Sequence, residues 1–508
     1  MKTALVGIVK NEAHDILYWL AWHALLGVDS FILFDDDSDD GTRDLITAAS
    51  LHWDVRLFHI REHSLDLSSQ DHAERQRQVY LDALSAIAMD EQSYDWVGFL
   101  DTDEYVRLYA HETLPEFLES LPADAGAVAL HWQVYGHDNH ITTPSLPPFH
   151  SFSRHSTAGE AINRHVKSFI RPHCWKKGQW VNVHYFALAE GRYVTSSGAP
   201  VAWSAVPGIT VGYPDWAVAS LMHFQRRSLE QFVKRVLNRK DLQLTLSDHQ
   251  LAQWNDIEDT VPREKTSDVL RWVRPVITAG AMTVLEEMRR QHPPIPGLTP
   301  PSTRQNPAGF RVFSLHPKDA RHPGLVNDLL QDLGSAEQQG GEFQLFLIQS
   351  LIHPEAAFLF GLDEKDRIRD FFILHDGRLT GLPRYDILPV IEQTAIALRQ
   401  HGGQKRFLCS PPTEPMAPDR QAVSLWECFI TIPQETTPSG ASWLSLSPFN
   451  LLEMALGAPT FTLDTISTLT AIDRETTVWL LPLLALHLQA PQYRELHSHL
   501  GALAPFIL

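Results

Sequence analysis

Residues 1–135 alternate between short apolar runs and stretches in which apolar side chains recur at helical spacing. The apolar runs predict buried strands at 3–9, 30–34, 55–59, 96–100 and 128–132. The helical spacing predicts helices at 13–26, around 45–49 and at 74–89. Strands that alternate with helices build a mainly parallel sheet covered on both faces. We therefore predict a Rossmann-like α/β fold with ligands at the carboxyl ends of its strands.

The pattern changes along the rest of the chain. Residues 140–215 contain many short segments bounded by turns, which predicts an irregular, hairpin-rich region that faces an acceptor. Helical spacing returns at 228–239 and 268–291, and a proline-rich segment follows at 291–308. We therefore predict an N-terminal domain at 1–290, a linker at 291–308 and a separate C-terminal domain of α+β or α/β class at 309–508. No motif in the C-terminal domain indicates a chemistry.

Composition excludes several classes of protein. The 508 residues are 44% hydrophobic and 20% charged, as in a folded globular protein. The formal net charge of −19 argues against a nucleic-acid partner. The three cysteines form no Cys-x-x-Cys, which indicates neither a disulfide framework nor a zinc knuckle. Apolar stretches are too short for a secretory signal or a transmembrane span, so we expect a soluble, cytoplasmic protein, with peripheral membrane association left open.

Two carboxylates, Asp101 and Asp103, follow the apolar run 96–100. Side chains alternate along an extended backbone, so residues two apart point the same way. Paired carboxylates hold Mg²⁺ or Mn²⁺, which keep coordination positions for water and substrate phosphates. The motif therefore predicts a metal and diphosphate site. An ordinary acidic loop is the alternative.

A second acidic segment, 35–42, follows the run 30–34. It does not fit a calcium-binding EF-hand loop, because counting from Asp35 the sixth position is Asp40 instead of glycine and the twelfth is Ile46 instead of glutamate. A solvated turn in which Asp40 or Thr42 caps the next helix is one interpretation. A ligand site is the other, because a cation, a nucleobase N–H or a ribose hydroxyl would relieve repulsion among adjacent carboxylates.

Three of these strand ends together resemble the GT-A-fold glycosyltransferases. Lys10-Asn11-Glu12 ends the first strand, Ser-Asp-Asp-Gly-Thr ends the second, and Asp101-Thr-Asp103-Glu-Tyr ends the strand near residue 100. This pattern is similar to the family 2-like branch, with Lys-Asn-Glu near the N-terminus and Asp-x-Asp-Glu.

Further segments add to the resemblance. Trp19 and His23 lie in a stretch similar to the first helix of that branch, and Gln76 with Tyr80 resembles its Gln-x-x-x-Tyr helix. The segment 223–235, which begins with His223, resembles its His-Tyr-x-x-Lys-Ser-x-x-x-Phe-x-x-Lys segment. The resemblance covers about residues 1–240 and leaves the C-terminal domain outside.

The resemblance implies a hexosyltransferase-like enzyme that moves a sugar from a nucleotide-diphosphate donor, with a UDP-sugar favoured, to a hydroxyl of a saccharide or other acceptor. Lys10, Asn11 and Glu12 would lie beside the base and ribose. Asp35 or Asp37 would lie at the uracil or ribose end. Direct in-line attack would invert the anomeric centre.

The resemblance also implies a metal centre that holds Mn²⁺ or Mg²⁺. Asp103 would ligate the metal, and Asp101 would contact the ribose or a metal-bound water. His223 would complete the metal shell, and a neutral imidazole suits Mn²⁺ better than Mg²⁺. The cation would offset charge on the departing diphosphate while a carboxylate deprotonates the acceptor hydroxyl.

The position of the catalytic base is open. Asp138, Glu160 and Asp215 all follow the Asp-x-Asp motif in the order that the resemblance requires. We favour Asp138, because it comes directly after a predicted strand that ends near residue 135.

Other polar side chains have plainer interpretations. Glu104 orients the Asp pair, and His23 and His184 are expected to be ordinary hydrogen-bonded histidines. Lys167 and Arg171 flank an apolar stretch, where they would contact either diphosphate or solvent.

Two other functions compete with sugar transfer. A non-catalytic sugar-nucleotide-binding scaffold is the first, although the intact Asp pair, Lys-Asn-Glu and His223 argue against it. An Asp-dependent phosphohydrolase is the second. Its motif expects Thr or Val two places after the second Asp, where this chain has Tyr105, and its sheet begins with the Asp strand, whereas here three strand–helix units precede it.

Overall fold

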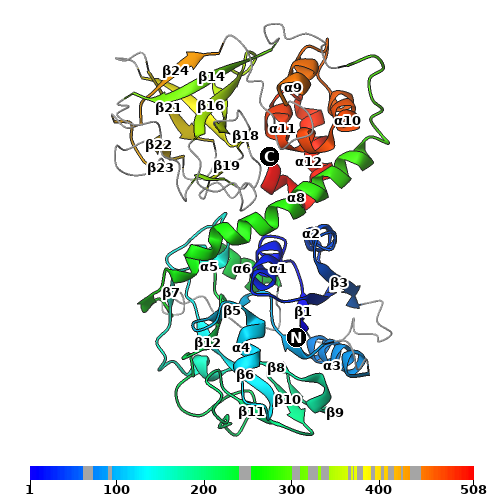
Figure 1. Ribbon diagram of the computed structural model, residues 1–508, viewed down its shortest axis with the longest axis vertical. Coiled ribbons are helices and arrows are strands. Elements are labelled where there is room, and N and C mark those ends of the chain that lie inside the picture. Colours follow the sequence, from blue (N-terminus) through cyan, green and yellow to red (C-terminus); the bar gives the residue numbers. More distant parts are fainter. Residues whose placement is uncertain are drawn as a thin grey trace. The chain divides into compact units, whose positions relative to one another are not determined.

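The computed structural model covers the whole chain, and its described residues are all except 61–71, 90–93, 239–252, 300–308, 319–329, 333–342, 364–367, 370, 374–381, 391–394, 402–404, 410–416, 425–426 and 435–447. The chain forms two compact units, Met1–Val273 (unit 1) and Arg274–Leu508 (unit 2). Each unit is described by itself below (Figure 1).

Unit 1 is built on a nine-stranded sheet with the order β3-β2-β1-β4-β8-β6-β12-β5, and β11 pairs with β6. Its strands are β1 (Thr3–Val9), β2 (Ser30–Asp35), β3 (Asp54–His59), β4 (Trp96–Phe99), β5 (Glu104–Leu108), β6 (Ala125–Val134), β8 (Val166–Ile170), β11 (Arg192–Val194) and β12 (Ala219–His223). The first four strands in this order are parallel. The predicted α/β class with a mainly parallel, Rossmann-like sheet is confirmed for this unit.

The middle of the sheet brings distant segments to one edge. β8 is antiparallel to both β4 and β6, β12 is parallel to β6, and β5 is antiparallel to β12. The carboxyl ends of β1, β2, β4, β6 and β12 therefore share one edge with the amino ends of β5 and β8. Ligands of open α/β sheets bind at such an edge.

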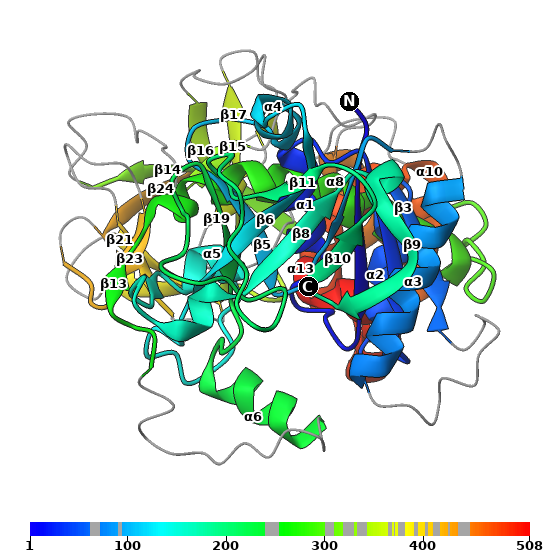
Figure 2. The same ribbon diagram turned by 90° about the horizontal axis from the view of Figure 1, so that it is seen from below.

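Helices cover both faces of this sheet. They are α1 (Ile16–Leu25), α2 (Thr42–Ala49) and α3 (His72–Met89). Because side chains alternate along a strand, Val6 of β1 and Ile32 of β2 join a buried cluster with α3, whereas Phe31 faces the other side and meets Trp19 of α1. Figure 2 shows α3 alongside these strands.

Short elements make up the rest of unit 1. They are α4 (Leu114–Ser120), α5 (Pro148–Ser151), β7 (Arg154–His155), η3 (Ala161–Arg164), η4 (Pro172–Cys174), β9 (Trp175–Asn182), β10 (Tyr185–Leu188), α6 (Leu229–Asn238), β13 (Ile257–Glu258) and η5 (Val261–Lys265). The β9–β10 hairpin agrees with the prediction of a hairpin-rich region after residue 140. Two strands of this region, β8 and β11, nevertheless belong to the nine-stranded sheet.

Helix α8 (Thr266–Met288) begins in unit 1 and ends in unit 2. Residues 300–308 of the predicted linker lie outside the described residues, so the domain limits at 290 and 309 stay predictions.

Unit 2 places antiparallel strands before helices. The strands are β14 (Phe310–Pro317), β15 (Leu330–Asp332), β16 (Phe343–Ser350), β17 (Ala356–Asp363), β18 (Ile368–Arg369), β19 (Phe371–Ile373), β20 (Arg384–Val390), β21 (Ala395–Gln400), β22 (Phe407–Cys409), β23 (Ala417–Arg420) and β24 (Phe429–Pro433). The helices are α9 (Pro448–Leu456), α10 (Leu463–Ile472), α11 (Arg474–Leu486), α12 (Ala490–Leu500), η7 (Gly501–Leu503) and α13 (Ala504–Ile507). Of the two predicted classes, α+β is the one observed, because strands and helices are segregated along the chain.

Two further findings concern the whole described chain. Its helices are all too short or too polar to cross a membrane. The three cysteines are free and buried.

Candidate functional site

The turn between β4 and β5 carries both carboxylates of the Asp-x-Asp motif to the carboxyl edge of the sheet. The backbone N–H of Glu104 donates to the carbonyl of Asp101 at 3.0 Å, which closes the turn. The indole of Trp19 donates to the Glu104 carbonyl at 2.8 Å and fixes the turn to α1. The first helix thus contacts the motif directly.

Asp103 is buried beside His223 at the end of β12 and beside arginines of the segment that follows. One carboxylate oxygen lies 3.5 Å from Nε2 of His223, and the other accepts a hydrogen bond from Arg235 of α6 at 3.0 Å. Burial opposes ionisation of Asp103, but His223, Arg235 and Arg227 together hold its pKa well below the usual range. Asp103 is therefore an anion at neutral pH.

Asp101 is oriented by side chains from two other elements. Gln76 of α3 donates to one of its oxygens at 2.6 Å, and Tyr80 lies 3.4 Å from the same oxygen. The ammonium group of Lys167 on β8 donates to the other oxygen at 3.0 Å. Burial opposes ionisation here too, yet Lys167 lowers the pKa of Asp101. Gln76 and Tyr80, which were identified by resemblance, therefore contact Asp101 directly.

Lys167 is completely buried and serves two carboxylates. Its Nζ lies 3.0 Å from Asp101 and 3.5 Å from Glu104, which is also completely buried. Burial disfavours the ammonium ion, but the two carboxylates raise the pKa of Lys167 above the usual range. Lys167 does not contact solvent, because β8 inserts between β4 and β6 and carries this side chain inward; its contact with diphosphate stays a prediction. Arg171 is half-buried and stacks on Trp96.

Glu104 links the motif to β6. Its carboxylate accepts from the backbone N–H of Asp101 and from the indole of Trp132, both at 2.8 Å. Burial raises the pKa of Glu104 to about 7, which Lys167 opposes. These contacts agree with the interpretation of Glu104 as a positioning residue.

A second cationic group, Arg227, lies over the end of β1. Its guanidinium contacts Glu12 at 2.9 Å and Asp15 at 2.8 Å. Burial raises the pKa of Glu12 although Arg227 acts in the opposite direction, and the charges of Asp15 and Asp103 raise it further. Glu12 therefore lies in the same electrostatic cluster as the Asp-x-Asp motif.

Lys10 and Asn11 face the acidic loop instead. The ammonium group of Lys10 donates to the carbonyl of Asp36 at 2.8 Å. Asn11 has a positive φ of 55°, its N–H donates to Ser38, and its side-chain oxygen accepts from the N–H of Asp39. These two residues hold the first and second strand ends together.

The acidic loop 35–42 is neutralised largely by its own surroundings. Arg75 pairs with Asp36 at 2.7 Å, and His59 lies 3.1 Å from Asp37. Buried Asp35 accepts from the N–H of Ser38. Asp37 is partly exposed at the sheet edge, so of the two predicted base or ribose contacts it is the more accessible.

The three candidates for the catalytic base have different surroundings. Asp138 is mostly buried; its carboxylate accepts from Ser153 and lies 3.5 Å from Arg154. Hydrogen bonds from Ser197 and its neighbours outweigh burial and lower the pKa of Asp215 to about 2, which makes it a weak base. Glu160 is exposed. Asp138 stays the predicted base.

Asp103 and His223 fit a divalent cation. They bring one carboxylate oxygen and one imidazole nitrogen together at an edge to which the sheet directs ligands. Two protein ligands are enough for a cation that takes its other ligands from phosphate and water. Asp101 is turned toward Lys167 and Gln76, which agrees with a separate role for that carboxylate.

Sequence reasoning assigned no role to Arg227 or Arg235. Both lie in the segment 223–235 that was identified by resemblance, four and twelve residues after His223. Two arginines soon after a candidate metal ligand, in a chain with a net charge of −19, could have indicated cationic residues of the site.

Comparisons with known proteins concern mainly this unit. Residues 7–201 match glycosyltransferase family 92. A glycosyltransferase family 92 protein of Oryza sativa subsp. japonica is 26% identical over 191 residues, which are 37% of this chain and 30% of that protein. One of Arabidopsis thaliana is 25% identical over 193 residues, which are 36% of this chain and 30% of that protein. The match thus spans about 30% of the length of these relatives.

Solved structures give a weaker likeness. TarS of S. aureus is 11% identical with a TM-score of 0.25, and the alignment covers 88% of each chain. The galactosyltransferase LgtC with donor and acceptor sugar analogs is 12% identical with a TM-score of 0.23, over 49% of this chain and 99% of that one. TM-scores this low carry no argument. The family match supports the predicted class of enzyme, a glycosyltransferase, and the family 2-like branch stays a prediction.

Proposed function

We propose that this chain is a glycosyltransferase that moves a sugar from a nucleotide-diphosphate donor, with a UDP-sugar favoured, to the hydroxyl of an acceptor. The match to family 92 supports sugar transfer over the part of the chain that carries Asp101, Asp103 and Lys167. The observation that carries the proposal is the pairing of Asp103 with His223 at the carboxyl edge, because carboxylate and imidazole donors there suit a cation that binds diphosphate.

The surrounding side chains have defined tasks in this proposal. A divalent cation held by Asp103 and His223 would offset the charge that develops on the departing diphosphate. Lys167 keeps Asp101 ionised, and Gln76 holds its orientation for a ribose hydroxyl. The site thus presents acceptors for hydroxyl groups next to a binding position for phosphate oxygens.

Acceptor activation would come from the predicted base. Asp138 would take the proton of the acceptor hydroxyl while that oxygen attacks the anomeric carbon, and the bond to the diphosphate oxygen would break. One direct displacement inverts the anomeric centre. Release of the carboxylate from Ser153 would be needed for this role, because Ser153 donates to it twice.

Release of UDP from a panel of UDP-sugars tests the proposal. With Mn²⁺ and excess donor we expect slow hydrolysis without an acceptor and faster turnover with a saccharide acceptor, both lost in EDTA. A scaffold protein would bind donor and release no UDP with any acceptor. A phosphohydrolase would instead release inorganic phosphate from a generic phosphomonoester.

A further inference from the structure

Unit 2 contains a group of ligand-type side chains that has no part in the site of unit 1. His292 follows α8, whereas Glu495 and His499 lie on α12. One ligand atom from each of these three residues lies within 4.8 Å of the others. Glu495 and His499 are four residues apart, so they share one face of their helix.

The imidazole of His292 lies between two carboxylates. Its Nδ1 lies 3.1 Å from a carboxylate oxygen of Asp464 on α10, and its Nε2 lies 2.9 Å from a carboxylate oxygen of Glu495. When Nδ1 donates to Asp464, the lone pair of Nε2 is available to a cation that Glu495 also contacts.

His499 supplies a third ligand atom within the same 4.8 Å. The two imidazole rings are perpendicular, at 88°, with centroids 6.4 Å apart, so they are not stacked on each other. Asp464 and Glu495 also bring two negative charges, which a dication balances.

The backbone around His292 is already fixed. The N–H of His292 donates to Met288 at the end of α8, and the N–H of Ile295 donates to Thr468 of α10 at 2.8 Å. A carboxylate on the outer nitrogen of a ligating histidine fixes the orientation and the tautomer of the ring, as is usual at zinc sites. Asp464 is the carboxylate beside the outer nitrogen, Nδ1, of His292.

We propose that His292, Glu495 and His499 form a binding site for a transition-metal dication of the Zn²⁺ type, with Asp464 as the positioning residue of His292. Two imidazoles and one carboxylate are ligands that Zn²⁺ takes with a water in the fourth position. The metal fastens α12 to the segment that follows α8. This inference is independent of the function of unit 1.

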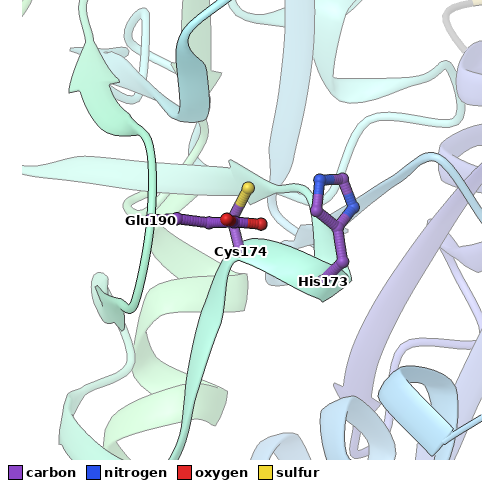
Figure 3. A group of neighbouring side chains, drawn as sticks. All are labelled: His173, Cys174 and Glu190. Carbon is purple, nitrogen blue, oxygen red and sulfur yellow. The ribbon is translucent and has the colours of Figure 1, made fainter.

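A second group complicates the measurement. His173, Cys174 and Glu190 also bring ligand atoms within 4.8 Å of one another in unit 1, and Figure 3 shows the thiol and the carboxylate close together with the imidazole beside them. Cys174 is buried, and burial raises the pKa of its thiol, which disfavours the thiolate that a metal needs. Cys174→Ser removes the thiol of this second group, so zinc binding is measured in the full chain with that substitution.

The test is calorimetric titration of the metal-stripped chain with Zn²⁺ alone, with Cys174→Ser and also Asp103→Asn in place, because Asp103 and His223 form a separate candidate cation site. We expect one equivalent to bind, and His499→Ala to weaken that binding at least a hundredfold. Asp464→Asn should weaken it about ten- to a hundredfold without removing a ligand. His497→Ala, an exposed histidine on the same helix, is the matched control and should change nothing.

A rise in melting temperature with added Zn²⁺ is the second readout, and it should disappear in His499→Ala. Absence of stoichiometric binding, or equal affinities of the His499→Ala and His497→Ala chains, would overturn the proposal. Unchanged affinity in Asp464→Asn would remove Asp464 from it. Because His499 is only half-buried, its variant tests the proposal even if His292→Ala does not fold.

Discussion

Two acidic segments follow strands of the same sheet, and they differ in the groups that neutralise them. In the loop after β2, Asp36 pairs with Arg75 and Asp37 with His59, while Asp35 accepts from a backbone N–H within its own turn. In the turn after β4, the neutralising groups are buried or come from distant parts of the chain.

Two such groups are hydrogen-bonded to the carboxylates of the turn after β4. Lys167 lies 66 residues from Asp101 in sequence, and Arg235 lies 132 residues from Asp103. A wholly buried ammonium ion is costly unless carboxylates surround it. The comparison teaches that the number of acidic residues does not distinguish the two segments, whereas the completely buried ammonium group of Lys167 does.

Loss of the buried cation should have the largest effect. Lys167→Met leaves Asp101 and Glu104 without their shared counter-charge, so we expect a loss of about 3–5 kcal/mol in the unfolding free energy of unit 1, measured by urea denaturation. Adding Glu104→Gln to this variant should recover part of the loss, because one buried negative charge is removed. A loss below about 1 kcal/mol would mean that Lys167 stabilises its segment no more than a surface ion pair stabilises the other one.

Asp103→Asn should lower turnover of a nucleotide-sugar about 10²–10³-fold, because the amide cannot replace the anionic ligand of a cation. Initial rates of UDP release with Mn²⁺ measure this effect. Asp39→Asn, an exposed carboxylate in the other acidic segment, is the matched control and should keep full activity. Equal rates for the two variants would remove the proposed difference between the segments.

His131, a buried histidine outside both segments, makes the stability of the fold depend on pH. Burial lowers the pKa of His131 to about 4, and its Nδ1 accepts from the N–H of Asp215. In the unfolded chain His131 binds a proton near pH 6.5, whereas in the folded chain it does so only near pH 4. This contribution is fully present above pH 6.5, and stability falls by at most about 1.4 kcal/mol per pH unit between these values.

Urea titrations at pH 7, 6 and 5 measure this slope. We expect it to be smaller in His131→Gln, which has no titrating ring. An unchanged slope would mean that other groups dominate the pH dependence, such as His23 and His184, whose pKa values are also lowered by burial.

Asp37→Asn should have the smallest effect. Its ion pair with His59 is at the surface, so we expect a stability change below about 1 kcal/mol. If Asp37 also contacts the base or ribose, the KM for donor rises about tenfold while kcat is kept. Asp44→Asn, exposed on α2, is the control. An unchanged KM would make the loop after β2 purely structural.

Local pattern was sufficient for much of unit 1. The apolar run 3–9 coincides with β1, and the run 96–100 places the Asp pair at a strand end. Continuous burial on both faces makes such strands visible in sequence. The burial of Lys167 was not predicted. Val166–Ile170 has a charged residue inside it, and the two strands that pair with it come from distant segments.

The site was predicted only in part for the same reason. Asp101, Asp103 and His223 were identified from motifs, and the structure brings all three to one edge. Arg227 and Arg235 belong to a segment that pairs through β12 with β6 and β5, a long-range register that no local periodicity encodes. Counter-charges of a buried cluster are set by such pairings, so their roles became visible only in three dimensions.

The central claim is that Asp103 and His223 bind a divalent cation next to a donor diphosphate. Crystals of the full chain soaked with Mn²⁺ and UDP, with diffraction recorded above the manganese absorption edge, test it most directly. The account predicts an anomalous peak that contacts Asp103, His223 and the diphosphate. Bound UDP with no manganese beside Asp103, or with manganese elsewhere, would contradict it.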